Sequence, residues 1–268
     1  MNDPQTAGAS VGSKSFTVIS KRQQQILDYL GTRSMVTVNE LVAATGASPA
    51  TIRRDLVRLD DEGRIYRVRG SVSLKSSGSR QPTTSEKRTL HHEQKIRIAE
   101  EAVKLVHPGD SVLLDAGTTT IEIASRICEM PLKVITTDLN IGILLAPHRN
   151  IDLSLTGGTV DWSSQSCIGD LAREVLLRIH PTVTFISCNA WDLRMGITAP
   201  TIEKARLKAD LLKQATKTVL VADSSKYGNS QLFEVGRLSQ ADLIITDSDL
   251  GGEDAEKVRN AGVSLKLV

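Results

Sequence analysis

The chain has 268 residues, 40% of them hydrophobic and 24% charged, and carries a formal net charge of +2, so it can hold two globular domains with a sizeable core in the larger one. No apolar run approaches the roughly 20 residues of a membrane span and no signal pattern begins the chain, so we expect a cytoplasmic protein with no membrane partner. Cys128, Cys167 and Cys188 show no paired spacing, which indicates buried thiols and predicts no disulfide framework, metal site or cofactor.

The N-terminal part of the chain begins with a segment that lacks any hydrophobic periodicity. Residues 1–15 are rich in Gly, Ser, Ala and Thr, which is typical of a disordered leader. From 21 to 33, Ile26, Leu27 and Leu30 recur at helical spacing and predict a first helix, followed by a short strand over 35–38. These elements open a domain predicted over 20–75.

The stretch SPATIRRDLVRLDDEG, residues 48–63, predicts a helix with one buried and one cationic face. Ser48 can cap its N-terminus, and Pro49 fits the first turn. At about 100° per residue the apolar positions share one face, while Ala50 and Arg54 lie opposite, with Thr51 and Arg58 at the flank. A short apolar stripe upstream, ended by Thr45 and Gly46, suits a helix-turn-helix corner. The alternative is an ordinary amphipathic helix pair with a solvated charged face.

The residues that follow favour DNA binding. Between Tyr66 and Leu74 the side chains alternate, which predicts a strand or hairpin whose outer face carries Arg67 and Arg69, as in the wing of a winged helix. Residues 21–75 hold ten Lys or Arg and six Asp or Glu, a net charge of +4, whereas residues 76–268 have a net charge of −2. The positive charge therefore lies where a DNA-binding domain needs it.

This stretch also resembles the DeoR family of bacterial transcriptional regulators. The family pattern T-I-R-R-D-L-x-x-L-x-x-x-G-x-x-x-R is met by Thr51, Ile52, Arg53, Arg54, Asp55, Leu56, Leu59, Gly63 and Arg67. The resemblance implies a double-stranded DNA operator as partner. Our candidate DNA-binding residues are Ser48, Ala50, Thr51, Arg53, Arg54, Arg58, Arg67 and Arg69.

After the first domain we predict a linker over 76–90, because this stretch is polar and contains Gly78 and Pro82. A long amphipathic helix is predicted over 85–106, and an effector-binding domain over 91–268. His91 and His92 are adjacent, so they do not face one site on a helix and do not indicate a metal site.

The second domain is predicted to be α/β, because short β-branched runs alternate with helical stretches from residue 111 onward. The runs SVLLD, KVIT, IDLSL, VTFIS, TVLVA and DLIIT predict strands of a mostly parallel sheet with crossover helices. In such sheets ligands bind beyond the carboxyl ends of the strands, so the loops there are the candidate site.

The loop over 115–120, DAGTTT, predicts a phosphate-binding loop at a helix N-terminus. Gly117 permits a ligand to approach the backbone closely, and the free N–H groups of the helix N-terminus favour an anion. The alternative is a strand-to-helix turn capped by threonine. Polar groups after other strands, together with Thr137 and Gly158 at the rim, gather at the same sheet edge. The candidate effector-binding residues are Asp115, Gly117, Thr118, Thr119, Thr120, Asp138, Gly157, Asn189, Asp192, Lys208 and Lys226.

This half resembles the DeoR-family sensor domain, which is similar in fold to ribose-5-phosphate isomerase and CoA-transferase-like enzymes. The motifs D-A-G-T-T and A-D-S-S-K-Y-G carry the resemblance, which implies a phosphorylated sugar or related metabolite as effector. The chain departs from the family at two places: residues 187–190 read S-C-N-A instead of G-A-D-G, and Arg206 replaces the acid of an E-x-K pair. These changes suggest a more anionic or differently hydroxylated effector.

Two functions from different classes remain open. The first is a transcriptional regulator of carbohydrate metabolism genes, a repressor in the common family role, controlled by its effector and acting as a homodimer or homotetramer. The second is an isomerase-like sugar-phosphate enzyme with a regulatory DNA-binding appendage. An isomerase needs a carboxylate base near a sugar carbon, and the amide of Asn189 weakens that alternative.

Overall fold

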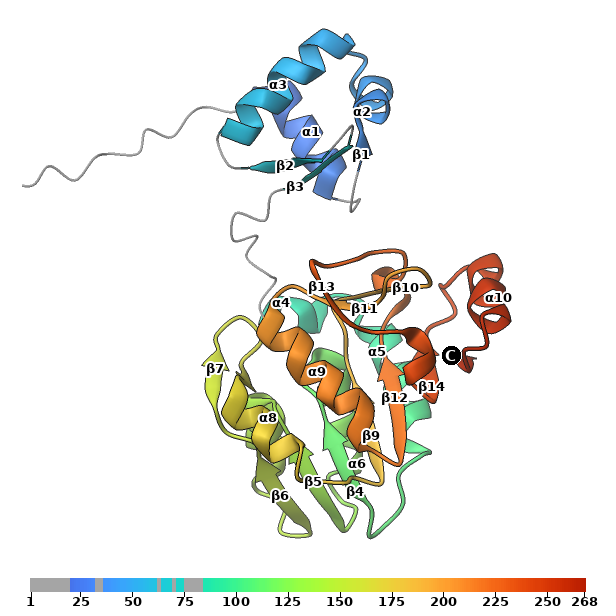
Figure 1. Cartoon of the computed structure of the whole chain (residues 1–268). Helices are drawn as coiled ribbons and strands as arrows, with labels where there is room; N and C mark the ends of the chain where they lie inside the picture. The colour runs from blue at the N-terminus through green and yellow to red at the C-terminus, as the bar shows by residue number, and fades with distance from the viewer. Residues whose placement is uncertain (1–19, 32–35, 62–63, 69–70, 75–83) are drawn as a thin grey trace, which may run out of the picture. The chain divides into compact units, whose positions relative to one another are not determined.

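The computed structural model describes residues 20–31, 36–61, 64–68, 71–74 and 84–268, which belong to two compact units, Met1–Ser79 and Arg80–Val268 (Figure 1). The predicted leader over 1–15 lies outside the described residues. Within the described residues, no helix is long and apolar enough to cross a membrane.

The described part of the N-terminal unit folds as a winged helix-turn-helix. An antiparallel sheet with the strand order β1-β3-β2 packs beside the helices. The elements are α1 (Lys21–Gly31), β1 (Val36–Thr37), α2 (Val38–Thr45), α3 (Pro49–Asp61), β2 (Ile65–Val68) and β3 (Ser71–Leu74). The apolar stripes predicted for the helices form its core, and each of the following side chains is at most 1% exposed: Ile26, Leu30, Leu41, Ile52, Leu56 and Leu59.

The wing is a hairpin and not one continuous strand. Strand β2 pairs with β3 in a register that joins Ile65 to Leu74 and Arg67 to Val72, and residues 69–70 between the strands lie outside the described part. Residues directly opposite one another share a face of an antiparallel pair, so Arg67 and Val72 lie on the same face. The predicted alternation of side chains between two faces therefore does not continue unbroken from Tyr66 to Leu74. The short strand predicted over 35–38 is confirmed as β1, which pairs with β3 of the wing.

The predictions for the junction between the domains are partly wrong. The predicted linker, 76–90, contains helix α4 (Thr84–Thr89), and the predicted long helix over 85–106 is two helices, α4 and α5 (His92–Val103). The break lies at His91, whose φ of 51° is left-handed and ends helical continuity. The carbonyl groups of Lys87 and Leu90 at this break accept hydrogen bonds from the ammonium of Lys95.

The C-terminal unit is built on a seven-stranded parallel sheet with the strand order β15-β14-β12-β9-β4-β5-β6. Six of these strands are the six predicted ones, and β15 is an addition at one edge. The strands are β4 (Ser111–Leu114), β5 (Leu132–Thr136), β6 (Ile151–Leu155), β9 (Val183–Ile186), β12 (Lys217–Val221), β14 (Leu243–Thr246) and β15 (Leu265–Leu267). The predicted mostly parallel α/β fold is confirmed.

Helices cover both faces of this sheet. In Figure 1, α8 and α9 lie in front of the strands, and α5 and α6 lie behind them. Alternate residues of β4 show the two layers, since Val112 and Leu114 pack with α5, α6 and α7 while Leu113 packs with α8, α9 and α10. The helices not yet given are α6 (Thr118–Ile127), α7 (Leu139–Leu145), α8 (Asp170–Leu176), α9 (Ile202–Gln214) and α10 (Gly252–Asn260), with short 3-10 turns η1 (Ser224–Lys226) and η2 (Leu238–Gln240).

Two small antiparallel additions were not predicted. They are the hairpin β7 (Thr159–Asp161) with β8 (Ser166–Ile168), and the sheet of β10 (Ala190–Asp192), β11 (Gly196–Ala199) and β13 (Phe233–Gly236). The chain runs from β4 toward one edge through β5 and β6, whereas β9, β12, β14 and β15 extend toward the other edge. The strand order therefore reverses at β4 and β9, where open α/β sheets bind ligands.

Candidate functional site

The turn between α2 and α3 has the geometry of a helix-turn-helix corner. Gly46 ends α2 with a φ of 68°, which glycine adopts without a Cβ penalty, and its N–H donates to the carbonyl of Val42. The Ser48 hydroxyl then accepts from the backbone N–H of Thr51 at 3.2 Å. The predicted cap at Ser48 is confirmed, and α3 starts at Pro49.

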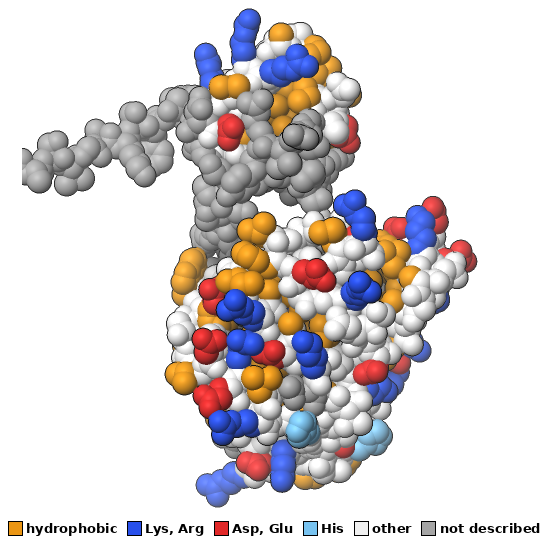
Figure 2. Space-filling model, viewed as in Figure 1, with side chains coloured by type: hydrophobic (Ala, Val, Ile, Leu, Met, Phe, Trp, Pro, Cys, Tyr) orange, Lys and Arg blue, Asp and Glu red, His pale blue; other side chains and the backbone are white. Residues whose placement is uncertain are grey.

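Helix α3 presents its cations to solvent. Arg53, Arg54 and Arg58 are all exposed, as are Ser48 and Ala50, while Thr51 is half-buried by its contact with Ser48. Figure 2 shows basic side chains gathered on one face of the N-terminal unit. This arrangement suits phosphate and base-edge contacts. Of the two predicted wing residues, Arg67 lies in β2 with its side chain outside the described part, and Arg69 lies outside it altogether.

Asp55, the acid within the I-R-R-D-L motif, has a different position from the arginines beside it. Its side chain is 7% exposed and accepts from Nε of Arg22 at 2.5 Å, which raises the pKa of that guanidinium. The ion pair joins α1 to α3. Asp55 therefore orients the exposed helix and is not part of its outer face.

A cavity of about 200 Å³ lies beyond the carboxyl ends of the central strands of the C-terminal unit. The residues that follow β4, β5, β9 and β12 contribute Asp115, Thr137, Ser187 and Asp223 to its wall. Six of the eleven predicted effector residues line it: Asp115, Gly117, Thr118, Asn189, Lys208 and Lys226. The structure thus brings together residues that are up to 111 positions apart in the chain.

The loop after β4 approaches the loop after β9 very closely. A Cβ on Gly117 would lie 2.6 Å from Oγ and 2.7 Å from Cβ of Ser187, so this close approach requires glycine. Asp115 accepts a hydrogen bond from the N–H of Ser187 at 3.0 Å and forms an ion pair with Lys208. Helix α6 then starts at Thr118, whose side chain lines the cavity, with the unpaired N–H groups of a helix N-terminus beside it.

The other two threonines of this loop are not in the cavity wall. Thr119 is 1% exposed, and its hydroxyl has no hydrogen-bond partner among the described residues. Thr120 donates to the carbonyl of Asp115 at 2.6 Å and to that of Gly117 at 2.7 Å. Of the three threonines, only Thr118 is placed to meet a ligand.

Three further predicted effector residues and Arg206 also lie outside the cavity wall. Asp138 caps α7 by accepting from the N–H of Asn140 at 2.7 Å, and Asp192 accepts from the N–H groups that close the turn between β10 and β11. Gly157 has a φ of 70° in the turn after β6. Arg206 is exposed on α9, so its positive charge does not enter the cavity.

In the part of the chain that the structure describes, five lysines line the cavity, and three of them are paired with carboxylates. Lys204 lies 2.7 Å from Asp161, Lys226 lies 3.6 Å from Asp223, and Lys208 pairs with Asp115. The other two have no carboxylate contact within the described part of the chain. They are Lys95, whose ammonium is held by two backbone carbonyls, and Lys87 of α4.

The electrostatics of the cavity favour an anion. Burial lowers the pKa of Lys87 to about 8, and the nearby charges of Lys226, Lys204 and Lys208 lower it in the same direction. Burial opposes the ionisation of Asp223, yet the charge of Lys226 is among the effects that hold its pKa below the ordinary value. Two positive charges therefore have no carboxylate partner among the described residues of a partly buried site.

Sequence reasoning missed Lys87, Lys95 and Lys204. Lys204 had a signal, because it lies four residues before Lys208 on α9 and so occupies the same helix face. Lys87 and Lys95 were not singled out, because Lys87 falls in the predicted linker and Lys95 falls within the predicted helix over 85–106. Their placement depends on the break at His91, which also lines the cavity.

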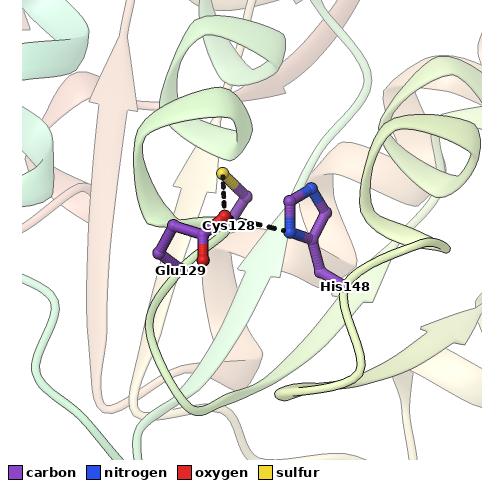
Figure 3. Close-up of side chains that lie close together, drawn as sticks. All are labelled: Cys128, Glu129 and His148. Carbon is purple, nitrogen blue, oxygen red and sulfur yellow. Dashed lines mark hydrogen bonds and ion pairs between the residues drawn. The ribbon is translucent and has the colours of Figure 1, made fainter.

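A second group of reactive side chains lies at the opposite end of the sheet. Cys128, at the end of α6, and His148, before β6, approach the carboxylate of Glu129 at 3.9 and 3.4 Å (Figure 3). Thiol, imidazole and carboxylate are zinc-ligand types, but Glu129 is 85% exposed. Because both segments precede strands, this group is separate from the cavity beyond the strands' carboxyl ends. Cys167 and Cys188 are buried free thiols, and burial raises the pKa of Cys188 to about 11.

Comparison with known proteins agrees for both units. Residues 22–78 match the DeoR-like helix-turn-helix domain, and residues 90–248 match the DeoR C-terminal sensor domain. Together the two matches span most of the described residues.

Relatives match along nearly their whole length. An HTH-type transcriptional regulator of Haemophilus influenzae is 35% identical over 93% of this chain and 97% of its own. A putative aga operon transcriptional repressor of Escherichia coli O157:H7 is 34% identical over 96% and 97%. The HTH-type transcriptional regulator GlpR of Haloferax volcanii is 33% identical over 92% and 96%. Among solved structures, ribose 5-phosphate isomerase A of Methanocaldococcus jannaschii matches with a TM-score of 0.38 and 17% identity, over 51% of this chain and 54% of that one.

Proposed function

Since the chain belongs to the DeoR family of HTH-type transcriptional regulators, we propose that it is a repressor of carbohydrate metabolism genes whose operator binding is controlled by a phosphorylated sugar or a related phosphorylated metabolite. Operator DNA is contacted by the exposed face of α3 and by the wing. The effector occupies the cavity of the C-terminal unit. The protein acts as a homodimer or homotetramer, because paired half-sites require a symmetric protein.

The observation that carries the effector proposal is the unbalanced charge of the cavity. Five lysines line it, and the three carboxylates that contact them leave Lys87 and Lys95 unpaired within the described residues. A phosphate monoester carries a charge of about −1.5 to −2 at pH 7 and would balance these two cations. The N-terminus of α6 offers further donors beside Thr118. The cavity is also large enough only for a small metabolite.

The same geometry argues for a sensor over an isomerase. Among the described residues, the two carboxylates that line the cavity are Asp115 and Asp223, and each is held by a lysine and by hydroxyl or backbone donors. A general base must be free to accept a proton from a sugar carbon. Incubation of the purified protein with phosphopentoses and phosphohexoses should therefore give no turnover.

The direct test begins with DNA from upstream of the encoding gene, in which protection mapping locates the operator. Binding of the full chain to this operator is then titrated against a panel of sugar phosphates and the same sugars without phosphate. We expect at least one phosphorylated sugar to release the protein, and its unphosphorylated counterpart to be inactive. Failure of every phosphorylated sugar to change operator binding would contradict the proposal.

A further inference from the structure

The two lysines of the cavity without a carboxylate partner among the described residues differ in the contacts that their ammonium groups make. Lys95 is 3% exposed, and its ammonium already donates to the carbonyls of Lys87 and Leu90. Lys87 is half-buried and has no ion pair within the described part of the chain. It stands on α4, a helix of six residues. Lys87 is therefore the cation whose charge is free to be met by a ligand.

The charged groups around Lys87 come from three elements. Lys226 belongs to η1, Lys204 and Lys208 belong to α9, and all three repel the Lys87 ammonium. Asp161 at the end of β7 attracts it, but this carboxylate already contacts Lys204 at 2.7 Å. The electrostatic field at Lys87 therefore favours a negatively charged ligand.

On the premise of the proposed function, we infer that this cavity discriminates between ligands by their charge. It binds a dianionic phosphate monoester in preference to a monoanionic group of the same size, and Lys87 determines that preference. A monoanion would leave one of the two surplus cations unbalanced in a partly buried site. Charges that are partly buried interact much more strongly than charges in water. The second negative charge should therefore count heavily in the affinity.

Two fragment probes separate charge from shape. Methyl phosphate and methyl sulfate are both tetrahedral and nearly equal in size, but near pH 7.5 the phosphate is mainly a dianion, its second pKa being about 6, while the sulfate stays a monoanion. Calorimetry on the full chain would measure both dissociation constants. We expect the wild type to bind methyl phosphate about 10- to 100-fold more tightly, the range that a charged hydrogen bond supplies.

Three variants locate the source of the preference. Lys87→Met keeps the aliphatic stem without the charge and should bring the ratio of the two constants close to one, mainly by weakening methyl phosphate. Lys87→Arg keeps the charge and should keep the preference. Lys104→Met removes one charge from an exposed side chain that does not line the cavity, and should leave the ratio unchanged.

Equal affinities of the wild type for the two probes, or no binding of methyl phosphate, would overturn the inference. So would a Lys87→Met protein that keeps the wild-type ratio. The proposed function fails by a different result, since it is read from operator release. A protein that is released by a phosphorylated sugar but does not distinguish the two probes refutes only the inference, and one that distinguishes the probes but keeps its operator in all sugar phosphates refutes only the proposed function.

Discussion

Arg54 and Lys87 are the two cations whose roles differ most clearly at the scale of single residues. Arg54 lies on the exposed face of α3, opposite the apolar stripe that Ile52 and Leu56 bury. Its side chain is exposed, so it is available to contact a base edge. Lys87 lies in a cavity among three other ammonium groups, so its charge is costly until an anion arrives.

The first prediction concerns Arg54→Ala. A bidentate contact between arginine and guanine supplies about 1–3 kcal/mol of discrimination, so the variant should lose specific operator binding while keeping weak, salt-sensitive binding to arbitrary DNA. Competition between operator and random DNA measures the ratio. Arg259→Ala, an exposed arginine of α10, is the control and should bind as the wild type does. A wild-type ratio in the Arg54 variant would show that another residue reads the base.

The second prediction follows from the lowered pKa of Lys87. A bound dianion favours the charged ammonium, so binding raises this pKa from about 8 and takes up a proton. The affinity for methyl phosphate should then have its full value just below about pH 8 and fall as the pH rises above it. On the acid side it should fall below about pH 6, where the phosphate loses its second charge.

Binding isotherms measured across this pH range test the prediction. In Lys87→Met, the affinity for methyl phosphate should fall much less above pH 8 than in the wild type. Burial also lowers the pKa of Lys95, so the decrease that remains in the variant is assigned to Lys95. An affinity that stays constant from about pH 7 to 9 in the wild type would show that Lys87 does not meet the anion.

At the scale of elements, the close approach of two loops shapes part of the cavity wall. Gly117 precedes α6, and Ser187 follows β9, with no room for a Cβ between them. Gly117→Ala should therefore lower the free energy of unfolding by about 1–3 kcal/mol, as overpacking of a tight contact does, and weaken anion binding. The cost should shrink in a Ser187→Gly background, because the atoms that the new methyl group meets are then absent.

Denaturant unfolding of the four proteins of this double-mutant cycle gives the coupling energy. Gly252→Ala is the matched control, since a Cβ there has no atom within 4 Å and the residue is helical. Additive effects of the Gly117 and Ser187 changes would mean that the loops can separate without cost.

Elements that depend on local pattern could be predicted from the sequence, and those that depend on tertiary contacts could not. The six predicted strands are short runs of four or five residues rich in apolar and β-branched side chains, so all six were found, whereas β15 has only three residues and a half-buried pattern. The break between α4 and α5 is stabilised by Lys95, whose ammonium bonds to carbonyl groups that a continuous helix would occupy. No periodicity signals such a contact.

The candidate site shows the same division. Strand order placed Asp115, Asn189 and Lys226 correctly at one edge, because the carboxyl ends of parallel strands meet there. It could not show which of three consecutive threonines faces inward. The structure selects Thr118, since Thr119 is buried and Thr120 returns its hydroxyl to the backbone.

At the scale of the whole molecule, the two units divide the work. The N-terminal unit carries the net positive charge and the exposed arginines, and the C-terminal unit carries the cavity. An effector can change operator binding only through a difference in its affinity for two states of the protein. A variant of the cavity should therefore shift the effector concentration that is needed for release without changing operator affinity in the absence of effector.

The central claim, that an anion in this cavity controls operator binding, is tested most directly by operator release titrated with a phosphorylated sugar. Thr118→Val and Lys226→Met each remove one cavity donor, and Thr119→Val makes the same change at the buried neighbour. Without effector all three should bind operator as the wild type does. The account predicts that Thr119→Val is released at the wild-type concentration, while the two cavity variants need about 10- to 200-fold more effector. Release of all four proteins at one concentration would contradict it.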